Sequence, residues 1–525
     1  MTDAAVDAGG HRSPQNLAEL LISRARCSPN LRFGVAGSDM RLVDAIDLAA
    51  RAAQALTGTR LTRGACAMVI GTTSTNYLVA WAALQLAGIQ AALVNPTYPT
   101  DLLRDMAANL KPDAVLWLGR EGDRAVAPGV PHYDLTSVDS ESICLDGDEV
   151  PLPEPADLSA QPGREPPGLA AEPGDITSYM HTSGTSGPPK FCAQSHEYML
   201  RLGRFIADTM SFTRFDIVFA PLPMFHVNPL GYGVVASLLA GASVLGADRF
   251  SASQFWPTVI ANQVTAAVLH LPPVAILKKA THPADAKGHR LRVVFTGDPE
   301  FLERFEVPQG VAAYGSTEAG GLCHATICRP QDQDAPPEGM MRRAGRARYD
   351  IEWQLADDGE ILVRDKGQGR ALFSGYRRAG VITSALDGGG WFHTGDLGRV
   401  DEWGNLIFVE RLSESIRVKG EYVPIGYVEQ QLLKADGLGD FALWRRPATL
   451  GGQEAGEQEV VLYISRPSGT TPETLRQVRD AVAPLPAFMR PVAVSRIAAI
   501  PRDSGVGKVQ RRRLEEAPVL ETWPL

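Results

Sequence analysis

The segment Tyr179–Lys190 constrains this chain more than any other, because it combines a glycine-rich turn with a cluster of hydroxyl groups. It reads Tyr-Met-His-Thr-Ser-Gly-Thr-Ser-Gly-Pro-Pro-Lys. Glycines let the backbone turn sharply and bring its N–H groups close to an anion. Hydroxyl groups add donors, and Lys190 adds a mobile positive charge. The segment is not a Walker loop. It predicts either a loop that closes over a triphosphate or a polar surface loop.

Five further blocks of sequence decide between these two interpretations. In chain order they are Pro221–Asn228, Tyr314–Glu318, Trp391–Gly398, Arg411–Gly420 and Pro501–Lys508. Together with Tyr179–Lys190 they resemble the adenylate-forming enzymes, a family that includes acyl- and aryl-CoA synthetases, peptide-synthetase adenylation domains and beetle luciferases. The blocks stand in that family's order and extend to the C-terminus. The resemblance implies that the loop binds nucleotide through Thr182, Ser183, Gly184, Thr185, Ser186, Gly187 and Lys190, with Thr182 also taking part in catalysis.

The composition is that of a globular protein with more than one domain. The chain has 525 residues, of which 44% are hydrophobic, and is too long for one ordinary core. Its net charge of −9 argues against a nucleic-acid binder, which usually carries a basic patch. The six cysteines are scattered, which fits a reducing cytoplasm. The sequence shows neither a signal peptide nor an apolar run of the roughly 18 residues that a membrane span needs.

Apolar patterns alternate between strand and helix in the N-terminal part of the chain. They predict strands at 67–70, 91–94 and 114–118 and helices at 76–87 and 102–110, which is typical of a parallel sheet covered by helices. The proline-rich and acidic stretch 146–174 predicts an irregular connection. Alternation around Asp357-Asp358-Gly359 predicts a hairpin.

The family resemblance extends this pattern to a two-domain fold. It implies a large α/β N-terminal domain, residues 1–411, in which helix-covered sheets are joined by a small β-subdomain. A smaller, mobile α+β domain, residues 412–525, is expected to follow it.

The block Tyr314–Glu318, Tyr-Gly-Ser-Thr-Glu, carries the groups expected of a nucleotide site. The Tyr314 ring can stack on adenine, and the Thr317 hydroxyl can reach a phosphate oxygen. Glu318 can hold Mg²⁺, a cation that prefers carboxylate and phosphate oxygens; a charge at a helix N-terminus is the alternative. The resemblance implies that Glu318 is catalytic and that Asp396 accepts hydrogen bonds from the ribose hydroxyls. It adds Gly297, Asp298, Pro299, Gly315, Ser316 and Arg411 to the nucleotide-binding residues.

The block Pro221–Asn228 is expected to line the site of the acid. A lone histidine is more often structural, but the resemblance gives His226 a substrate-binding and catalytic role, with Phe225 and Asn228 as neighbours. Gly315 and Gly320 complete the predicted acyl site. Amino-acid-activating relatives place an aspartate where His226 stands, so a plain carboxylic acid is favoured over an α-amino acid. The small side chains of 231–247 predict either tight helix packing or room for a bulky acyl group.

The C-terminal blocks are expected to serve both half-reactions. Ser413 stands at the hinge position, and Lys508 resembles the lysine that stabilises charge during adenylation. The segment expected to contact CoA comprises Arg417, Lys419, Gly420 and Glu421; surface charges are the alternative for Arg417 and Lys419.

Three departures from the family pattern concern adenylation. Ser413 replaces a charged hinge residue, Phe191 stands where glycine is usual, and the loop 501–508 is one residue longer than usual. One residue spans up to about 3.5 Å of chain, and a misplacement of about 1 Å can cost roughly a hundredfold in rate. We therefore hypothesise that carboxylate activation is slow or lost, while thioester formation from a preformed acyl-adenylate persists.

These observations predict an AMP-forming acyl- or aryl-CoA ligase. It would use ATP (or an acyl-adenylate), Mg²⁺, CoA and a carboxylic acid, and its adenylate would come from a separate adenylating enzyme if its own adenylation is lost. The alternatives are a ligase that loads a separate carrier protein and a non-catalytic nucleotide-binding relative. A homodimer is expected only because two-fold dimers are the commonest oligomers of soluble proteins.

Overall fold

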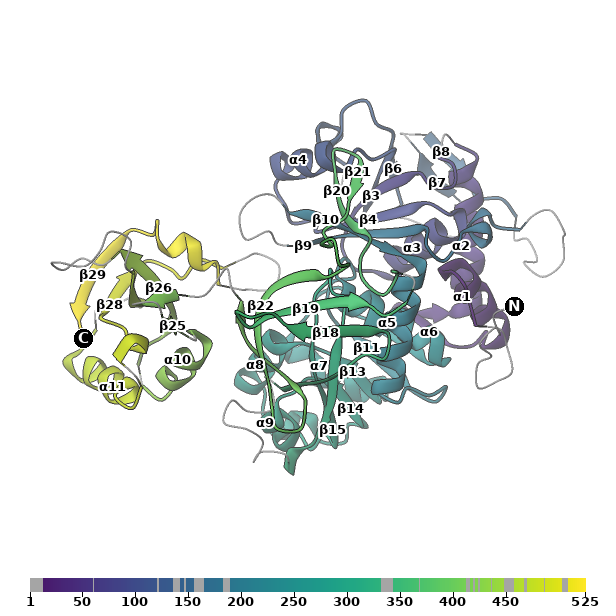
Figure 1. Ribbon diagram of the computed structural model, residues 1–525. Helices are drawn as coiled ribbons and strands as arrows, with labels where there is room; N and C mark the ends of the chain where they lie inside the picture. The colour runs from purple at the N-terminus through teal and green to yellow at the C-terminus, as the bar shows by residue number, and fades with distance from the viewer. Residues whose placement is uncertain are drawn as a thin grey trace. The chain divides into compact units, whose positions relative to one another are not determined.

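The structure is a computed structural model of residues 1–525 (Figure 1). It describes residues 13–59, 61–119, 122–135, 142–145, 148–154, 165–182, 189–331, 343–367, 369–411, 416–418, 421–423, 425–435, 437–447, 458–466, 470–485, 487–502 and 509–525. The chain forms two compact units. Unit 1 comprises 1–354, 362–394 and 400–406, and unit 2 comprises 355–361, 395–399 and 407–525.

A ten-stranded sheet of unit 1 carries the first wall of the candidate site. Its order is β21, β20, β10, β9, β4, β3, β5, β6, β7, β8. The bounds are β3 Cys66–Gly71, β4 Gln90–Val94, β5 Ala114–Leu118, β6 His132–Asp134, β7 Ser142–Leu145, β8 Asp148–Pro151, β9 Ile176–Thr182, β10 Lys190–Ser195, β20 Gly375–Arg378 and β21 Val381–Thr383. β3 pairs in parallel with β4 and β5, whereas β10 pairs antiparallel with β9 and β20. The predicted strand–helix alternation is therefore confirmed.

A thirteen-stranded sheet carries the second wall. Its order is β18, β19, β22, β23, β17, β16, β15, β14, β13, β11, β12, β1, β2. The bounds are β1 Arg32–Val35, β2 Met40–Arg41, β11 Ile217–Ala220, β12 Ser243–Gly246, β13 Ala266–Val268, β14 Val293–Phe295, β15 Gln309–Tyr314, β16 His324–Cys328, β17 Arg343–Ala347, β18 Ile351–Leu355, β19 Glu360–Asp365, β22 Phe392–Val400 and β23 Leu406–Arg411. Strands β11 to β15 run parallel. Their carboxyl ends meet at one edge, where α/β sheets bind ligands.

Helices cover these sheets (Figure 1). They are α1 Leu17–Cys27, α2 Leu42–Thr57, α3 Thr75–Ala87, α4 Thr100–Leu110, α5 His196–Thr209, α6 Ala236–Ala240, α7 Ala252–Ala261, α8 Leu271–Ala280 and α9 Pro299–Arg304, with short helices η1 Arg124–Val126, η2 Pro167–Ala170 and η4 Pro283–Ala286. The Ser74 and Ser195 side chains cap α3 and α5 by accepting hydrogen bonds from backbone N–H groups. Helix α3 is apolar all round and buried almost throughout, as expected of a helix enclosed by the core.

Two details of the sequence prediction can be judged against these elements. The irregular connection over 146–174 is wrong in part, because β8 pairs antiparallel with β7 and η2 lies within the stretch. The hairpin is confirmed: the Ala356 N–H donates to the Glu360 carbonyl between β18 and β19, and Gly359 adopts the left-handed conformation with φ +84°. That conformation explains the glycine.

Unit 2 contains a four-stranded sheet in the order β26, β27, β28, β29 and a separate two-stranded hairpin, β24 with β25. The bounds are β24 Ile416–Val418, β25 Glu421–Val423, α10 Ile425–Leu432, β26 Asp440–Pro447, β27 Gln458–Ser465, α11 Pro472–Val482, η8 Ala487–Met489, β28 Ala493–Ile497, η9 Arg511–Leu514 and β29 Val519–Pro524. Trp444, Leu462 and Val478 lie in its apolar core. The mixture of helices and strands agrees with the predicted α+β class.

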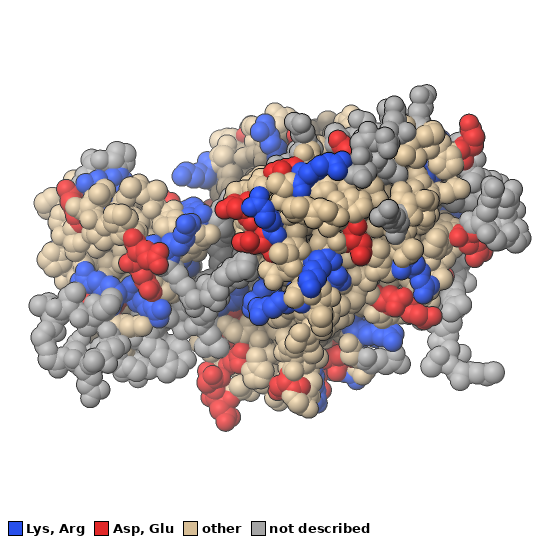
Figure 2. Space-filling view, turned by 90° about the horizontal axis from the view of Figure 1, so that it is seen from above, with Lys and Arg blue, Asp and Glu red and all other residues tan. Residues whose placement is uncertain are grey.

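The surface carries both signs of charge. Figure 2 shows basic and acidic side chains interspersed over the face in view. Among the described residues, no helix is long and apolar enough to cross a membrane.

Phe191 belongs to the core of the ten-stranded sheet. Its side chain is 1% exposed and packs in a cluster with Tyr179 and Ala193. Successive side chains of a strand point to opposite faces, so Phe191 points away from the face that carries Lys190 and Cys192. This departure from the family pattern therefore serves core packing.

We expect Phe191→Ala to lower the free energy of unfolding of its unit by about 3–5 kcal/mol, because it leaves a cavity in a packed core. Thermal and urea denaturation would measure the loss. Phe215→Ala is the matched control, because Phe215 is 78% exposed. Equal stabilities of the two variants would contradict the assignment of Phe191 to the core.

Candidate active site

The two ends of the predicted phosphate loop lie opposite each other. Loop residues 183–188, which include Ser183, Gly184, Thr185, Ser186 and Gly187, lie outside the described residues. Thr182, the last residue of β9, pairs in register with Lys190, the first residue of β10. Lys190 is exposed, and the buried Cys192 Sγ lies 4.0 Å from Thr182 Oγ1. Burial raises the pKa of the Cys192 thiol, so the base of the loop carries a neutral thiol beside the Lys190 charge.

The Tyr314–Glu318 segment leaves the end of β15 and is held by its backbone. The Thr317 carbonyl accepts a hydrogen bond from the Tyr198 hydroxyl at 2.8 Å, and the Glu318 carbonyl accepts one from the Phe373 N–H at 3.2 Å. Ser316 Oγ accepts from the Ala319 N–H. A Cβ atom on Gly315 would lie 2.5 Å from the Gly321 carbonyl oxygen, so the close approach of two chain segments requires glycine here. These contacts fix the backbone from which the Glu318 side chain extends.

Glu318 meets the phosphate-loop residues through Tyr376. The Tyr376 hydroxyl donates to Glu318 Oε1 at 3.1 Å, and the Lys190 Nζ lies 4.9 Å from the centre of the Tyr376 ring. Tyr376 is placed there by β20, in which it pairs with Cys192 of β10. The structure thus brings together Thr182, Lys190 and Glu318, which are distant in sequence. Sequence reasoning missed Tyr376 and Cys192, because neither belongs to a motif that the spacing singles out.

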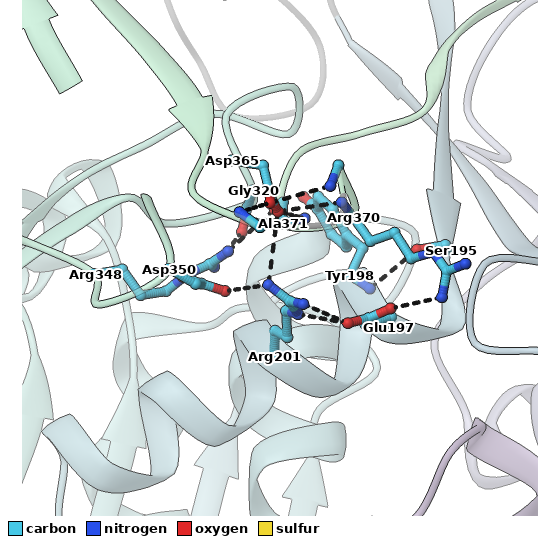
Figure 3. Close-up of polar contacts among 12 residues, drawn as sticks. Ser195, Glu197, Tyr198, Arg201, Gly320, Arg348, Asp350, Asp365, Arg370 and Ala371 are labelled. Carbon is cyan, nitrogen blue, oxygen red and sulfur yellow. Dashed lines mark hydrogen bonds and ion pairs between the residues drawn. The ribbon is translucent and has the colours of Figure 1, made fainter. Parts of the chain in front are cut away.

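A buried guanidinium supports the segment that follows Glu318 (Figure 3). Arg348 has no exposed surface, and it donates to the carbonyl oxygens of Gly320 at 3.0 Å, Leu322 at 3.1 Å and Ala371 at 3.0 Å. Its Nε donates to Asp350, so the buried charge is paired. Gly320 has φ +76°, and a Cβ there would lie 2.6 Å from the Ala371 carbonyl oxygen. The predicted substrate residue Gly320 is therefore fixed by backbone geometry.

A second layer of charges surrounds this arginine. Arg201 lies between Glu197 and Asp350 in Figure 3, with its Nη1 3.2 Å from Asp350 Oδ2 and 3.6 Å from Asp365 Oδ2. Asp365 accepts hydrogen bonds from the N–H groups of Arg370 and Ala371. These partners satisfy the buried charges, which would otherwise be costly. No sequence motif indicated this network, because its members come from separate elements.

Aromatic and imidazole rings form the wall predicted to hold the acid. The Phe225 and His226 ring centres are 4.6 Å apart, and His181 lies 5.9 Å from Phe225 and 6.1 Å from His226. Tyr98 lies 5.3 Å from His181. Burial, and then the neighbouring His226, lower the pKa of His181 to about 3, so this ring is neutral at physiological pH. Sequence reasoning found Phe225 and His226 but missed His181 and Tyr98.

The chain after Phe225 turns into the π-helix η3, Asn228–Val235. Such helices are rare and often lie at functional sites. The buried Asn228 Oδ1 has no hydrogen-bond partner among the described residues. One turn later, the Tyr232 hydroxyl donates to the Gly321 carbonyl at 2.8 Å and the Tyr232 ring contacts Phe295. The helix that begins at the predicted acyl residue Asn228 is thereby joined to the segment after Glu318.

The predicted nucleotide residues Gly297, Asp298 and Pro299 follow β14 at the same sheet edge. Pro299 begins α9, and Asp298 caps this helix by accepting from the Phe301 N–H at 3.0 Å. Asp298 Oδ2 also lies 2.8 Å from Lys278 Nζ. These contacts explain why an aspartate stands here, and a direct role of Asp298 in nucleotide binding stays a prediction.

The remaining predicted residues belong to unit 2. Arg411 Nε lies 2.9 Å from Asp396 Oδ1, so the two predicted ribose residues form an ion pair. Arg417 pairs with Tyr422, and Glu421 with Val418, in the β24–β25 hairpin. Arg502 and Val509 form an antiparallel bridge that closes the base of the lysine loop. Lys508, Ser413, Lys419 and Gly420 lie outside the described residues.

The donor set of the site fits Mg²⁺. Among the described residues, no group of three or more His, Cys, Asp or Glu side chains could hold a metal ion. Mg²⁺ is usually bound through one or two carboxylates together with substrate phosphates and water. Glu318 is a carboxylate beside the ends of the phosphate loop, and its binding of Mg²⁺ stays a prediction.

Comparison with known proteins places the chain in a family. The model of the AMP-binding enzyme family matches residues 43–379, which is more than half of the chain. This chain belongs to the AMP-binding enzyme family. The predicted resemblance to adenylate-forming enzymes is thereby confirmed.

The relatives of this AMP-binding enzyme include CoA ligases. A methyl-dioxo-octahydroindenyl-propanoyl:CoA ligase of Mycobacterium tuberculosis is 30% identical over 462 residues, which cover 84% of this chain and 86% of the relative. A 4-coumarate–CoA ligase of Humulus lupulus is 25% identical over 492 residues, 87% of this chain and 85% of the relative. Among solved structures, the o-succinylbenzoate CoA synthetase of Bacillus subtilis with its acyl-adenylate matches with a TM-score of 0.77 at 20% identity, over 97% of this chain and 99% of that chain. This structural likeness confirms the predicted fold class.

Buried histidines make the stability of this AMP-binding enzyme depend on pH. Burial lowers the pKa of His324 and of His181 to about 3 and that of His196 to about 4, while an unfolded histidine titrates near pH 6.5. Below about pH 6.5 the unfolded chain binds protons that the folded chain does not, so stability is lost as pH falls from there toward the folded pKa values. We expect the melting temperature to drop between about pH 7 and pH 5.

The variant His324→Gln removes one of these groups. We expect the slope of melting temperature against pH to become shallower in this variant, because each buried histidine contributes up to about 1.4 kcal/mol per pH unit. The readout is the slope, so a general loss of stability does not obscure it. An unchanged slope would show that His324 does not contribute.

Proposed function

We propose that this protein is an AMP-forming acyl- or aryl-CoA ligase that joins a carboxylic acid to CoA through an acyl-adenylate. One observation carries the proposal: the fold brings Thr182, Lys190 and Glu318, a hydroxyl, an ammonium and a carboxylate, to one place beside the predicted phosphate loop. Two relatives are named as CoA ligases, which supports the same function.

In the first half-reaction, a carboxylate oxygen of the acid attacks the α-phosphorus of ATP, and the bond to pyrophosphate breaks. Lys190 and the loop hydroxyls hold the phosphates, and Lys508 stabilises the charge that develops at the reacting centre. Mg²⁺, when bound, neutralises phosphate charge. Glu318 would supply the protein oxygen that binds Mg²⁺. Asp396 and Arg411 hold the ribose.

In the second half-reaction the CoA thiolate attacks the acyl carbon and AMP leaves. We propose that residues 412–525 rotate about Ser413 between the two half-reactions. The β24–β25 hairpin, with Arg417, Lys419, Gly420 and Glu421, then guides the pantetheine arm. Positioning of the reactants contributes more than covalent chemistry, so no nucleophilic side chain is required.

The substrate that we propose is a bulky, largely apolar carboxylic acid. The ring wall consists of Tyr98, His181, Phe225 and His226. His226 stands where amino-acid-activating relatives place the aspartate that pairs with the substrate amine. His181 stays neutral because of its burial. The relatives named for a bicyclic propanoyl group and for 4-coumarate agree with a ring-bearing acid. A carrier protein in place of CoA, a cytoplasmic location and a homodimer remain secondary proposals.

Two parallel assays on one library of carboxylic acids test the proposed function. The first supplies ATP, Mg²⁺, acid and CoA, and the second supplies the synthetic acyl-adenylate and CoA. We expect acyl-CoA in the second assay whether or not adenylation is impaired. Acyl-CoA in the first assay, with ATP–pyrophosphate exchange at rates normal for the family, would refute the hypothesis of impaired adenylation. Thioester formation only with an added carrier protein would favour the carrier-loading ligase. Nucleotide binding without turnover in either assay would favour a non-catalytic protein.

The variant Lys508→Ala separates the two half-reactions. If adenylation runs through this lysine, its loss should slow the ATP-dependent assay by about a hundredfold or more, as for other preorganised charge-stabilising groups. The adenylate-dependent assay should change little. Lys434→Ala is the control, because Lys434 lies on the exposed surface of unit 2. Equal losses in both assays would contradict the assigned role.

A further inference from the structure

Tyr376 contacts two charged groups of the candidate nucleotide site, Glu318 and Lys190. Its hydroxyl donates to Glu318 Oε1 at 3.1 Å, and its ring face lies 4.9 Å from Lys190 Nζ. One side chain therefore touches the carboxylate and the ammonium through two different parts of its structure. The chain offers no sequence motif for this residue.

The Tyr376 ring is held in place from two directions. Its backbone is fixed by the antiparallel pairing of Tyr376 with Cys192, in the same strand that begins with Lys190. Its ring meets Phe373 edge to face, with ring centres 4.9 Å apart. Phe373 in turn donates its N–H to the Glu318 carbonyl. The ring and the carboxylate it contacts are thus positioned by one connected piece of structure.

We propose that Tyr376 is a positioning residue of the nucleotide site, which orients Glu318 for Mg²⁺ and holds the Lys190 ammonium at the base of the phosphate loop. This inference rests on the proposed function. Mg²⁺ demands near-ideal octahedral geometry, and a carboxylate presents two oxygens to it. The hydroxyl bonds to Oε1, and the Cys192 thiol is a second hydrogen-bond partner of the Glu318 carboxylate. Each carboxylate oxygen has more than one lone pair, so the group can still bind the ion. The ring face attracts the ammonium of Lys190 through its quadrupole, so the cation is held close to the loop before nucleotide arrives.

The two contacts can be removed in two steps. Tyr376→Phe deletes the hydroxyl that donates to Glu318 and keeps the ring face that lies against Lys190. Tyr376→Leu deletes both contacts. Tyr198→Phe is the matched control, because its hydroxyl donates to the Thr317 carbonyl, the backbone neighbour of Glu318, and not to the carboxylate. All three variants remove a tyrosine hydroxyl that contacts Thr317 or Glu318.

The test measures ATP binding by calorimetry, with and without Mg²⁺, in the full chain. In the parent protein we expect Mg²⁺ to tighten ATP binding. We expect Tyr376→Phe to reduce this gain about tenfold, as befits a lost hydrogen bond to a charged group, with metal-free ATP affinity unchanged. Tyr376→Leu should also weaken metal-free binding about threefold, through the lost cation–π contact. Tyr198→Phe should lower the melting temperature and leave the Mg²⁺ gain intact.

Three results would overturn the inference. If Tyr376→Phe keeps the full Mg²⁺ gain, Tyr376 is a packing residue. The Tyr376→Phe variant could weaken metal-free and Mg²⁺-dependent ATP binding equally, or the Tyr198→Phe variant could also lose the Mg²⁺ gain. Either result would show a general effect that does not depend on the hydrogen bond from the Tyr376 hydroxyl to Glu318. If the parent protein binds no ATP at all, the ATP-dependent half-reaction of the proposed function fails together with the positioning role. A normal parent with an unaffected variant refutes the role of Tyr376 alone. Circular dichroism of each variant separates these outcomes from misfolding.

Discussion

The hydrogen bonds of the buried Arg348 guanidinium hold the candidate site in shape. One planar group donates to the carbonyls of Gly320, Leu322 and Ala371 and is neutralised by Asp350. Arginine suits this task because its donors are fixed in a rigid fork. The chain after Glu318 is thereby tied to the chain before Tyr376. Removal of one partner of a buried ion pair typically costs about 3–5 kcal/mol, so the network is important to both stability and site geometry.

The site itself is assembled from two sheets that present different chemistry. The ten-stranded sheet supplies Thr182 and Lys190, opposite each other on an antiparallel pair. The thirteen-stranded sheet supplies Glu318 from the loop after β15. Beside these charges lies the Cys192 thiol, which stays neutral because of its burial.

The sequence predicted the motifs and the fold class but not the contacts between motifs. Glycine, hydroxyl and charge patterns located Thr182, Lys190 and Glu318, because such patterns are local. Tyr376, His181 and Arg348 could not be found in this way, since their roles arise from strand pairing and from carbonyls that converge only in the fold. Phe191, directly after the loop lysine, looked like a departure that bears on adenylation. Strand alternation places it in the core instead, so only the hinge residue and the length of the lysine loop bear on adenylation.

A crystal structure with Mg²⁺ and an ATP analogue that cannot be cleaved between its α- and β-phosphates would test the central claim most directly. The account predicts Mg²⁺ at about 2.1 Å from one oxygen of Glu318, with the other oxygen still bonded to the Tyr376 hydroxyl and Lys190 near the phosphates. A metal ion bound away from Glu318, or a nucleotide bound outside the space between the β9–β10 turn and the Tyr314–Glu318 segment, would contradict it.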